Sequence, residues 1–198
     1  MSVKLITYTP NPEEILIKAF SQCYQLEKKG KNPNINVVIN NLKHGSVLEH
    51  VQYTFECKLS RTALMQLTRH RIGVAYTVES QRYNNYYNGF EYYIPETIAN
   101  DEYLKEVYKN FMNDIKDFYQ FLSDCEVPKE DARYILPNST MVNFVFSANL
   151  RALIHLWKLR LDSHAQKEIK DFAKEIMDIT LETLPNLADP IKKLVFDK

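Results

Sequence analysis

The chain has 198 residues, 45% of them apolar, and its 25 basic side chains balance 25 acidic ones. This length and composition fit a single domain spanning residues 1–198 with a substantial hydrophobic core. The zero net charge argues against nucleic acid as a partner, and no apolar run is long enough to cross a membrane.

The first part of the chain predicts a strand, two helices and a second strand. Residues 3–8 are typical of a short strand, and Asn11-Pro12 predicts the start of a helix that continues to about residue 30. A second helix is expected over residues 35–42. Residues 51–59 alternate apolar and polar side chains, which predicts a strand with one buried face.

The later part of the chain is richer in helix. A loop and then a strand are expected over residues 83–94, and apolar residues recur at helical spacing over residues 104–122. A strand over residues 140–147 should lead into a helix that Asn149 caps. Residues 163–166 fit a capping box for a long helix to about residue 185. The predicted fold class is α+β, an antiparallel-rich sheet flanked by long helices.

The three cysteines are widely spaced and odd in number: Cys23, Cys57 and Cys125. They form no disulfide framework, so we expect a reducing, cytoplasmic setting. The N-terminal segment also lacks the apolar run of a signal peptide, because prolines and acidic residues occur early in it. Cys23 and Cys57 fall on apolar faces, where we expect them to be buried.

A concentration of basic and polar side chains begins at Arg69-His70-Arg71 and continues at Ser80-Gln81-Arg82, all within fourteen residues. Gln66, Arg69 and His70 have helical spacing, so we place them on one face of a helix, with a connector containing Gly73 after it. The Arg guanidinium matches phosphate oxygens bidentately, which favours a site for a phosphorylated ligand. The alternative is a basic last turn of a helix, which the helix dipole favours.

This segment, RHRIGVAYTVESQRY, resembles the signature of the flavin-dependent (alternative) thymidylate synthases. The resemblance extends to HGSVLEH at residues 44–50, to NLRALIHLWKLRLDSHAQ at residues 149–166, and to Arg133 ahead of Ile-Leu-Pro. One departure is that the family signature has one residue fewer between its Arg-His-Arg and its Ser. We interpret the extra residue as a loop insertion, so that either Val78 or Glu79 fills the family's acidic position.

The resemblance implies a homotetramer with intersubunit active sites. It also implies reductive methylation of dUMP to dTMP, with methylenetetrahydrofolate as carbon donor and FAD reduced by NADPH as hydride carrier. The cofactor would carry the difficult chemistry. The sequence has no dinucleotide-binding glycine fingerprint, so FAD would have to bind through side chains and helix ends.

The resemblance also implies roles for individual residues. Arg160 matches the family's catalytic Arg, which is thought to favour ionisation at N3 of the uracil and so to activate C5. The residues that match dUMP contacts are Gln66, Arg69, Glu79, Ser80, Gln81, Arg82, Arg133 and Arg160. The residues that match FAD contacts are Ser46, Glu49, Arg69, His70, Arg71, Glu79, Asn149, Arg151 and His155. His155 stands where many members of the family have Asn.

Three other interpretations remain open. Five His and many acidic residues could form a metal-dependent hydrolase, but HExxH spacing is missing, so we expect no metal site. A nucleic-acid binder could use the basic cluster and the many Tyr for phosphate contact and stacking, against the neutral charge. A degenerate family member could bind flavin without turnover. Ser80 could be a nucleophile, although a phosphate-binding hydroxyl fits its setting better.

Overall fold

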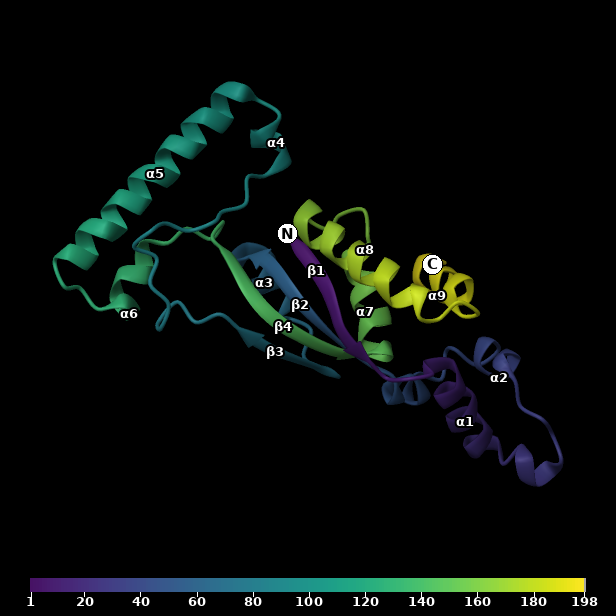
Figure 1. Ribbon diagram of the computed structural model, residues 1–198. Coiled ribbons are helices and arrows are strands. Elements are labelled where there is room, and N and C mark those ends of the chain that lie inside the picture. The colour runs from purple at the N-terminus through teal and green to yellow at the C-terminus, as the bar shows by residue number, and fades with distance from the viewer. Residues whose placement is uncertain (198) are drawn as a thin grey trace.

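The structure is a computed structural model that describes residues 1–197, an α+β arrangement around one sheet (Figure 1). In that range the four antiparallel strands have the order β1-β2-β4-β3. The strands are β1 (Ser2–Tyr8), β2 (Gln52–Ser60), β3 (Val74–Val78) and β4 (Met141–Asn149). The α-helices are α1 (Pro12–Tyr24), α2 (Ile35–Ile39), α3 (Arg61–Leu67), α4 (Glu96–Ala99), α5 (Glu102–Asp124), α6 (Lys129–Ala132), α7 (Leu150–Arg160), α8 (Lys167–Glu182) and α9 (Ala188–Phe196). Short 3-10 turns are η1 (Glu27–Lys29), η2 (Gly45–His50) and η3 (Arg133–Ile135).

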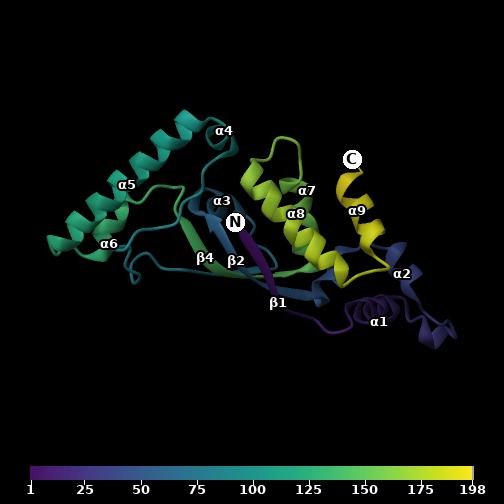
Figure 2. The same cartoon turned by 45° about the horizontal axis from the view of Figure 1, so that its top comes forward.

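The predicted alternation of residues 51–59 is confirmed in β2. Tyr53, Phe55, Cys57 and Leu59 are buried, whereas the residues between them are exposed or half-buried. β2 pairs with β1 on one side and with β4 on the other, so its buried face becomes the centre of the sheet. Helices α7 and α8 lie side by side over this face (Figure 2).

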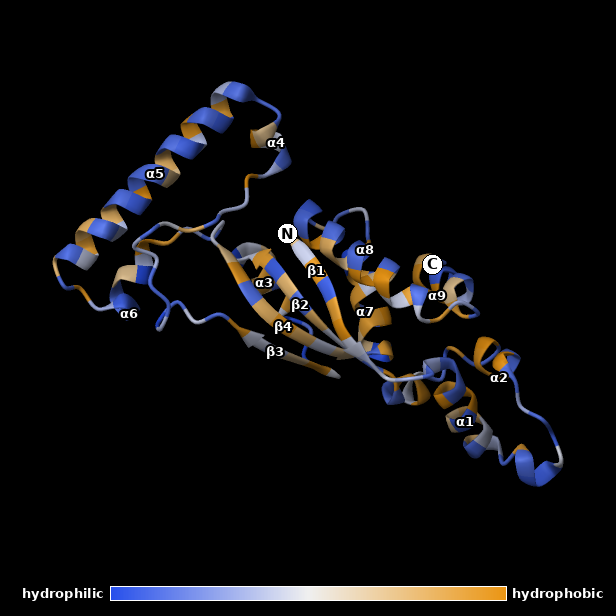
Figure 3. Cartoon of the chain, viewed as in Figure 1, coloured by the Kyte–Doolittle hydropathy of each residue, from blue (hydrophilic) through white to orange (hydrophobic). Residues whose placement is uncertain are grey.

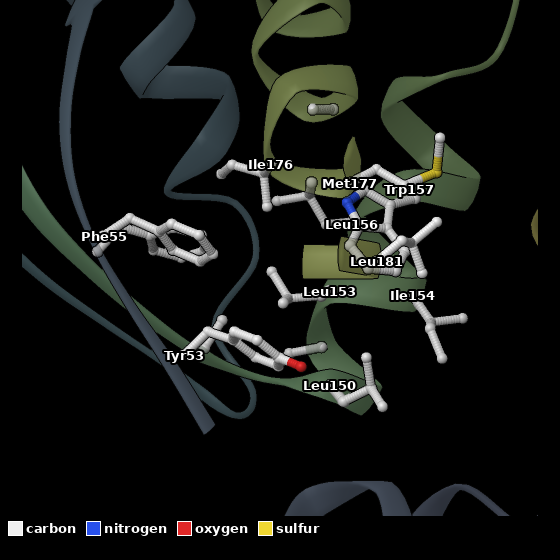
Figure 4. Close-up of a cluster of buried hydrophobic side chains, with 14 of the residues drawn as sticks. Tyr53, Phe55, Leu150, Leu153, Ile154, Leu156, Trp157, Ile176, Met177 and Leu181 are labelled. Carbon is white, nitrogen blue, oxygen red and sulfur yellow. The ribbon is translucent and has the colours of Figure 1, made fainter. Parts of the chain in front are cut away.

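The main hydrophobic core lies between the sheet and helices α7 and α8. Tyr53 and Phe55 of β2 face Leu153 and Trp157 of α7, with Ile176 of α8 beside them (Figure 4). All five side chains are fully buried. Burying a large apolar side chain stabilises a fold by roughly 1.5–3 kcal/mol, so this contact fixes α7 firmly on the sheet. The position of α7 matters because it carries Arg151, His155 and Arg160.

The helix predicted over residues 104–122 is confirmed as α5, which extends away from the sheet (Figure 1). It contacts the rest of the chain partly through a small cluster in which Tyr119 packs against Tyr86 and Ala132. Met112 is also buried, but several other apolar side chains are exposed, and the helix shows orange residues among blue ones (Figure 3). We call the exposed ones the apolar stripe of α5; they include Leu104, Val107, Phe111, Phe118 and Phe121.

Several expected boundaries are wrong. The first helix ends at Tyr24, because Gln25 adopts a left-handed conformation, and not near residue 30. Asn11 is also left-handed and makes no side-chain cap. The capping box expected over residues 163–166 does not form, and α8 begins without a side-chain cap. Residues 83–94 contain one isolated bridge, between Tyr92 and Thr140, in place of a strand.

The largest error concerns residues 72–79, which were interpreted as a loop with an insertion. Residues Val74–Val78 form β3, which pairs with β4 in an unbroken register. Helix α3 ends at Leu67, so Arg69 and His70 lie beyond the helix and do not share its face with Gln66. Cys57 is buried as expected, but Cys23 is exposed.

A buried carboxylate joins α8 to the start of α3. Glu168 is only 2% exposed and accepts hydrogen bonds from the Ser60 backbone N–H at 2.8 Å and from the Ser60 hydroxyl at 2.6 Å. The Ser60 hydroxyl also caps α3 by accepting from the N–H of Ala63 at 3.1 Å. The side chain of Glu168 therefore holds the N-terminus of the helix that ends just before Arg69.

We expect Glu168→Ala to lower the free energy of unfolding by about 2–4 kcal/mol, because the buried N–H and hydroxyl of Ser60 lose their acceptors. Urea denaturation followed by circular dichroism measures this loss. Glu175→Ala, another glutamate of α8, serves as the control and should change stability by less than about 0.5 kcal/mol. Equal midpoints for the two variants would contradict the structural role of Glu168.

Candidate active site

The side chain of Arg160, the last residue of α7, is oriented by two acceptors. Its Nε donates to Nε2 of His70 at 3.1 Å, and its Nη2 donates to the backbone carbonyl of Gln66 at 2.8 Å. Among residues 1–197 no side chain accepts from Nη1, so these N–H groups remain for a ligand. The side-chain amide of Gln66 donates in turn to Gln166. We call Gln66, His70, Tyr76, His155 and Arg160 the Arg160 cluster.

His70 is buried in this cluster, with 7% of its surface exposed. Its ring meets that of His155 edge to face, with ring centroids 5.6 Å apart. Burial, the positive charge of Arg160 and the nearby His155 lower the pKa of His70 to about 4. His70 is therefore a neutral imidazole near pH 7, and its Nε2 is free to accept the hydrogen bond from Arg160.

Tyr76 is a member of the site that the loop interpretation missed. Its hydroxyl, on β3, lies 3.0 Å from the carbonyl oxygens of both Leu67 and His70 and shares its single proton between them. These carbonyls follow the end of α3, where backbone acceptors lack partners within the helix. Burial raises the pKa of Tyr76, so the hydroxyl remains a donor. The alternation of Val74, Tyr76 and Val78 was the signal that could have revealed both the strand and this contact.

Asn149 connects the sheet to the Arg160 helix. Its side chain caps α7 by accepting from the N–H of Ala152 at 2.8 Å, as the sequence predicted, and its own N–H donates to Gly73 O at 2.9 Å. Gly73 has φ +71°, and a Cβ there would lie 2.5 Å from the Asn149 amide nitrogen. Only glycine fits both the backbone conformation and this close approach. The side chain of Asn149 is therefore engaged within the protein, and its expected contact with FAD remains a prediction.

A second group of residues surrounds Arg151. Its Nη1 forms an ion pair with Glu49 Oε1 at 2.6 Å, which brings together two side chains expected at the flavin. Glu49 and Ser46 both belong to η2, and both are exposed. The close approach depends on Gly45, where a Cβ would lie 2.7 Å from the Arg151 Nε. A cavity of about 290 Å³ opens beside Gly45 and Arg151, with Leu48 and Ile154 in its walls.

A third group contains the residues expected to bind phosphate. Arg82 Nε pairs with Glu130 Oε2 at 2.5 Å, and its guanidinium carbon lies 5.7 Å from the centre of the Tyr83 ring. The Ser80 hydroxyl accepts from the Arg82 N–H at 3.3 Å. Arg133 joins the group by donating to the Glu130 backbone carbonyl at 3.1 Å. We call Ser80, Arg82, Glu130 and Arg133 the Arg82 cluster.

Gln81 lies between the two phosphate-site residues but is 5% exposed. Its amide nitrogen is buried and has no hydrogen-bond partner among the described residues. A buried donor without a partner is costly, so this atom fits a hydrogen bond to a ligand. Arg69 and Arg71, in contrast, are exposed, and the described residues include no ion-pair partner for either guanidinium.

Glu79 has a well-defined structural environment. Its carboxylate accepts from the Tyr86 hydroxyl at 2.8 Å and from the Asn143 backbone and side-chain N–H groups at 3.2 and 2.9 Å. Burial raises its pKa, but these hydrogen bonds outweigh burial and hold the pKa below its usual value. The Glu79 N–H also extends the β3–β4 pairing by donating to Asn143 O. The expected contacts of Glu79 with dUMP and FAD remain predictions.

Residues 1–197 contain neither a cluster of metal ligands nor a membrane-spanning helix. In that range no group of three or more His, Cys, Asp or Glu side chains could hold a metal ion. The same range holds no helix that is long and apolar enough to cross a membrane. The Arg160 cluster, the Arg82 cluster and the exposed guanidinium groups of Arg69 and Arg71 provide the donors and positive charge that suit an anionic ligand.

Similarity to known proteins shows the family to which this chain belongs. The family model described as thymidylate synthase complementing protein matches residues 4–186. The flavin-dependent thymidylate synthase of Geobacter sulfurreducens is 34% identical over 94% of this chain and 85% of its own length. That of Sulfurisphaera tokodaii is 36% identical over 94% of this chain and 76% of its own length. The chain therefore belongs to the flavin-dependent thymidylate synthase family.

Solved structures of this family also resemble the chain in fold. A thymidylate synthase X from Helicobacter pylori, crystallised with FAD and dUMP, superposes with a TM-score of 0.78 at 26% identity and covers 99% of both chains. A second structure of the same enzyme has a TM-score of 0.72 at 28% identity, covering 90% of this chain and 93% of the other. The similarity thus includes α5 and the helices around Arg160 as well as the sheet.

Proposed function

We propose that this protein converts dUMP to dTMP with FAD as cofactor. The observation that carries the proposal is the orientation of Arg160 by Gln66 O and His70 Nε2, which leaves the remaining N–H groups of its guanidinium for a substrate. Family membership supports the reaction, because the relatives are flavin-dependent thymidylate synthases and the Helicobacter pylori structures contain FAD and dUMP.

The residues present fit FAD. Arg151 and His155 are both exposed on the same side of α7, and Arg151 borders a cavity with apolar walls. Arg69 and Arg71 offer unpaired positive charge for a diphosphate, and Ser46 and Glu49 lie on η2 across from Arg151. When bound, FAD supplies the hydride that completes the methyl group. His155 is a hydrogen-bond donor or acceptor at the place where an Asn is common.

Arg160 is the proposed catalytic residue. Its guanidinium would face the pyrimidine ring of dUMP, where it stabilises the negative charge that develops on the ring when C5 becomes nucleophilic. Burial lowers the pKa of Arg160, but an Arg side chain stays charged in proteins. Gln66 and Arg69 are proposed to hold the nucleotide beside it. Because two hydrogen bonds already orient the guanidinium, little reorganisation is needed during the reaction.

The phosphate of dUMP is assigned to Ser80, Gln81 and Arg82, with Arg133 as a further contact from another subunit. The Glu130 carboxylate pairs with the Arg82 guanidinium, the group that would bind the phosphate. Binding of dUMP then requires the Arg82–Glu130 pair to open. Both side chains are about half exposed, so this rearrangement costs little.

Two substitutions at this ion pair should have opposite effects on dUMP binding. Arg82→Ala is expected to raise the Kd of dUMP by roughly ten- to a hundredfold, as expected for a lost charge-assisted hydrogen bond. Glu130→Gln should lower that Kd, because the competing carboxylate is gone. Calorimetric titration of the flavin-loaded protein measures both values, and FAD affinity should stay unchanged. An unchanged Kd in Arg82→Ala would show that the phosphate binds elsewhere.

The proposal extends to co-substrates and assembly. Methylenetetrahydrofolate would supply the carbon and NADPH the electrons, with the whole chain acting as one domain in a cytoplasmic homotetramer. The exposed apolar stripe of α5 supports self-association, because monomers rarely expose so many aromatic side chains together. Intersubunit active sites would bring Arg133 of one copy to the nucleotide of another. Sedimentation analysis tests the tetramer, and Phe111→Glu should dissociate it if α5 lies in an interface.

The direct test of the proposed function is the visible absorption spectrum of the purified protein before and after addition of dUMP. Flavin bands that shift with dUMP place the nucleotide next to the isoalloxazine ring. A colourless protein that takes up no added FAD would overturn the proposal. A salt-sensitive affinity for oligonucleotides in place of flavin would instead favour nucleic-acid binding.

A further inference from the structure

His70 has a place in the structure that a flavin contact does not explain. Its ring is buried rather than directed to solvent, and it accepts a hydrogen bond from the proposed catalytic residue, Arg160, at 3.1 Å. Its own backbone is also fixed. The His70 N–H donates to Leu67 O at 3.0 Å, and the His70 carbonyl accepts from the Tyr76 hydroxyl at 3.0 Å.

The hydrogen bond with Arg160 determines the tautomer of His70. An Arg guanidinium has only donors, so Nε2 of the imidazole must be the acceptor. The single ring proton of the neutral form therefore lies on Nδ1. In a protonated His70 both ring nitrogens would be donors, so neither could accept from Arg160, and a second positive charge would lie beside that of Arg160. The side chains that contact the ring are Arg160 and His155 of α7, and Tyr76 of β3 contacts the His70 carbonyl; none of the three is an acid.

We propose that His70 is a positioning residue, which in its Nδ1–H tautomer holds Arg160 through Nε2 in the orientation needed for catalysis on the pyrimidine. This proposal rests on the proposed function for the identity of the reaction. Gln66 O fixes one end of the guanidinium at 2.8 Å, and His70 fixes the Nε edge. With two fixed points the planar guanidinium has one orientation, whereas with one it can rotate about the Gln66 contact.

The low pKa of His70, about 4, agrees with this role. Because the folded protein keeps the imidazole neutral below its ordinary pKa near 6.5, the unfolded chain takes up the proton first as the pH falls. The titration of His70 therefore leaves the free energy of unfolding unchanged above about pH 6.5 and lowers it as the pH falls from 6.5 to 4. The hydrogen bond to Arg160 itself should persist to near pH 4.

Two substitutions of His70 test whether it acts by accepting the hydrogen bond that positions Arg160. His70→Leu removes the acceptor and keeps an apolar side chain, so kcat for dTMP formation should fall roughly ten- to a hundredfold, the effect of losing a hydrogen bond to a charged group. His70→Gln carries an amide oxygen near the place of Nε2 and should restore most of that loss. The KM for dUMP should change less than threefold in both variants, within the scatter of such contacts.

Thr68→Ala is the matched control, because it changes an exposed side chain of the same turn but leaves the acceptor for Arg160 intact. Its kcat should remain within about threefold of that of the unchanged protein. Wild-type kcat in His70→Leu would overturn the proposal. So would equal losses in His70→Leu and His70→Gln, because the acceptor would then be irrelevant.

NMR spectroscopy tests the tautomer of His70 directly, and the result depends neither on the folding of a variant nor on the reaction that the protein catalyses. In protein labelled with ¹⁵N at His and Arg, His70 should show a protonated Nδ1 and an unprotonated Nε2. The Arg160 Nε–H should exchange slowly with water. A protonated Nε2 on His70 would overturn the proposal independently of any enzyme assay, whereas absence of bound flavin in the same sample would count only against the proposed function.

Discussion

Arg160→Ala is expected to lower kcat for dTMP formation by about 10²–10³-fold, the usual effect of removing one preorganised donor that stabilises developing charge. The residue lies at the end of α7, and its side chain reaches back to Gln66 and His70, so its removal should leave the sheet and the α7 core intact. FAD should stay bound, because Arg151 and His155 lie nearer the start of the helix. A radiolabelled or chromatographic assay of dTMP together with the flavin spectrum measures both properties.

Two controls sharpen this experiment. Lys174→Ala changes an exposed cation of the neighbouring helix α8 that has no ion-pair partner among the described residues, and it should leave kcat unchanged. Arg160→Lys keeps the charge but loses the planar fork, so it should give an intermediate kcat. Turnover of Arg160→Ala equal to that of the unchanged protein would exclude its catalytic role.

Deletion of Thr77 is expected to abolish dUMP binding and to destabilise the protein strongly. Thr77 lies within β3, whose register with β4 is unbroken from Val74 to Val78. Since side chains alternate along a strand, removing Thr77 places Tyr76 and Val78 on opposite faces. Either Tyr76 loses its contacts with Leu67 O and His70 O and its stacking on Phe146, whose ring centre is 5.2 Å away, or Val78 loses its place in the register with β4.

The control for this deletion is removal of Asn32, an exposed residue between η1 and α2. Connecting segments tolerate changes in length better than strands do, so the Asn32 deletion should keep dUMP binding within about threefold. Thermal unfolding and calorimetry with dUMP measure the two outcomes. Normal dUMP binding by the Thr77 deletion would mean that β3 does not define the position of the site.

The sequence predicted β1, β2 and β4 to within two residues of their bounds, and the prediction of β2 rested on its one buried face. β2 alternates over nine residues, and its apolar face is the centre of the sheet. β3 has only five residues, lies at the sheet edge and is at most half-buried, so its alternation is weak. The glycine before it also suggested a loop. The extra residue between Arg71 and Ser80 was therefore assigned to a loop, although most of that stretch is strand.

The motifs located the site, but they could not define its internal contacts. Gln66, His70, His155 and Arg160 come from α3, the turn after it and α7, and the structure brings them together. No sequence spacing indicates that Arg160 points back to His70, since that depends on how α7 packs over the sheet. Glu130 was likewise missed, because its ion pair with Arg82 joins residues far apart in the chain. The contacts of Arg69 and Arg71 still depend on a ligand or a second subunit.

The direct passage from β4 into α7 has a consequence for motion around the site. The first residues of α7 are held by the sheet, because Asn149 N–H donates to Gly73 O and Leu150 N–H donates to Val51 O, both at 2.9 Å. The opposite end of the helix, at Arg160, leads into the turn of residues 161–166. Amide hydrogens should therefore exchange slowly at the start of α7 and faster toward its end. Ligand binding should slow exchange only in the last turn, where the protein has retained freedom to adjust to its substrate.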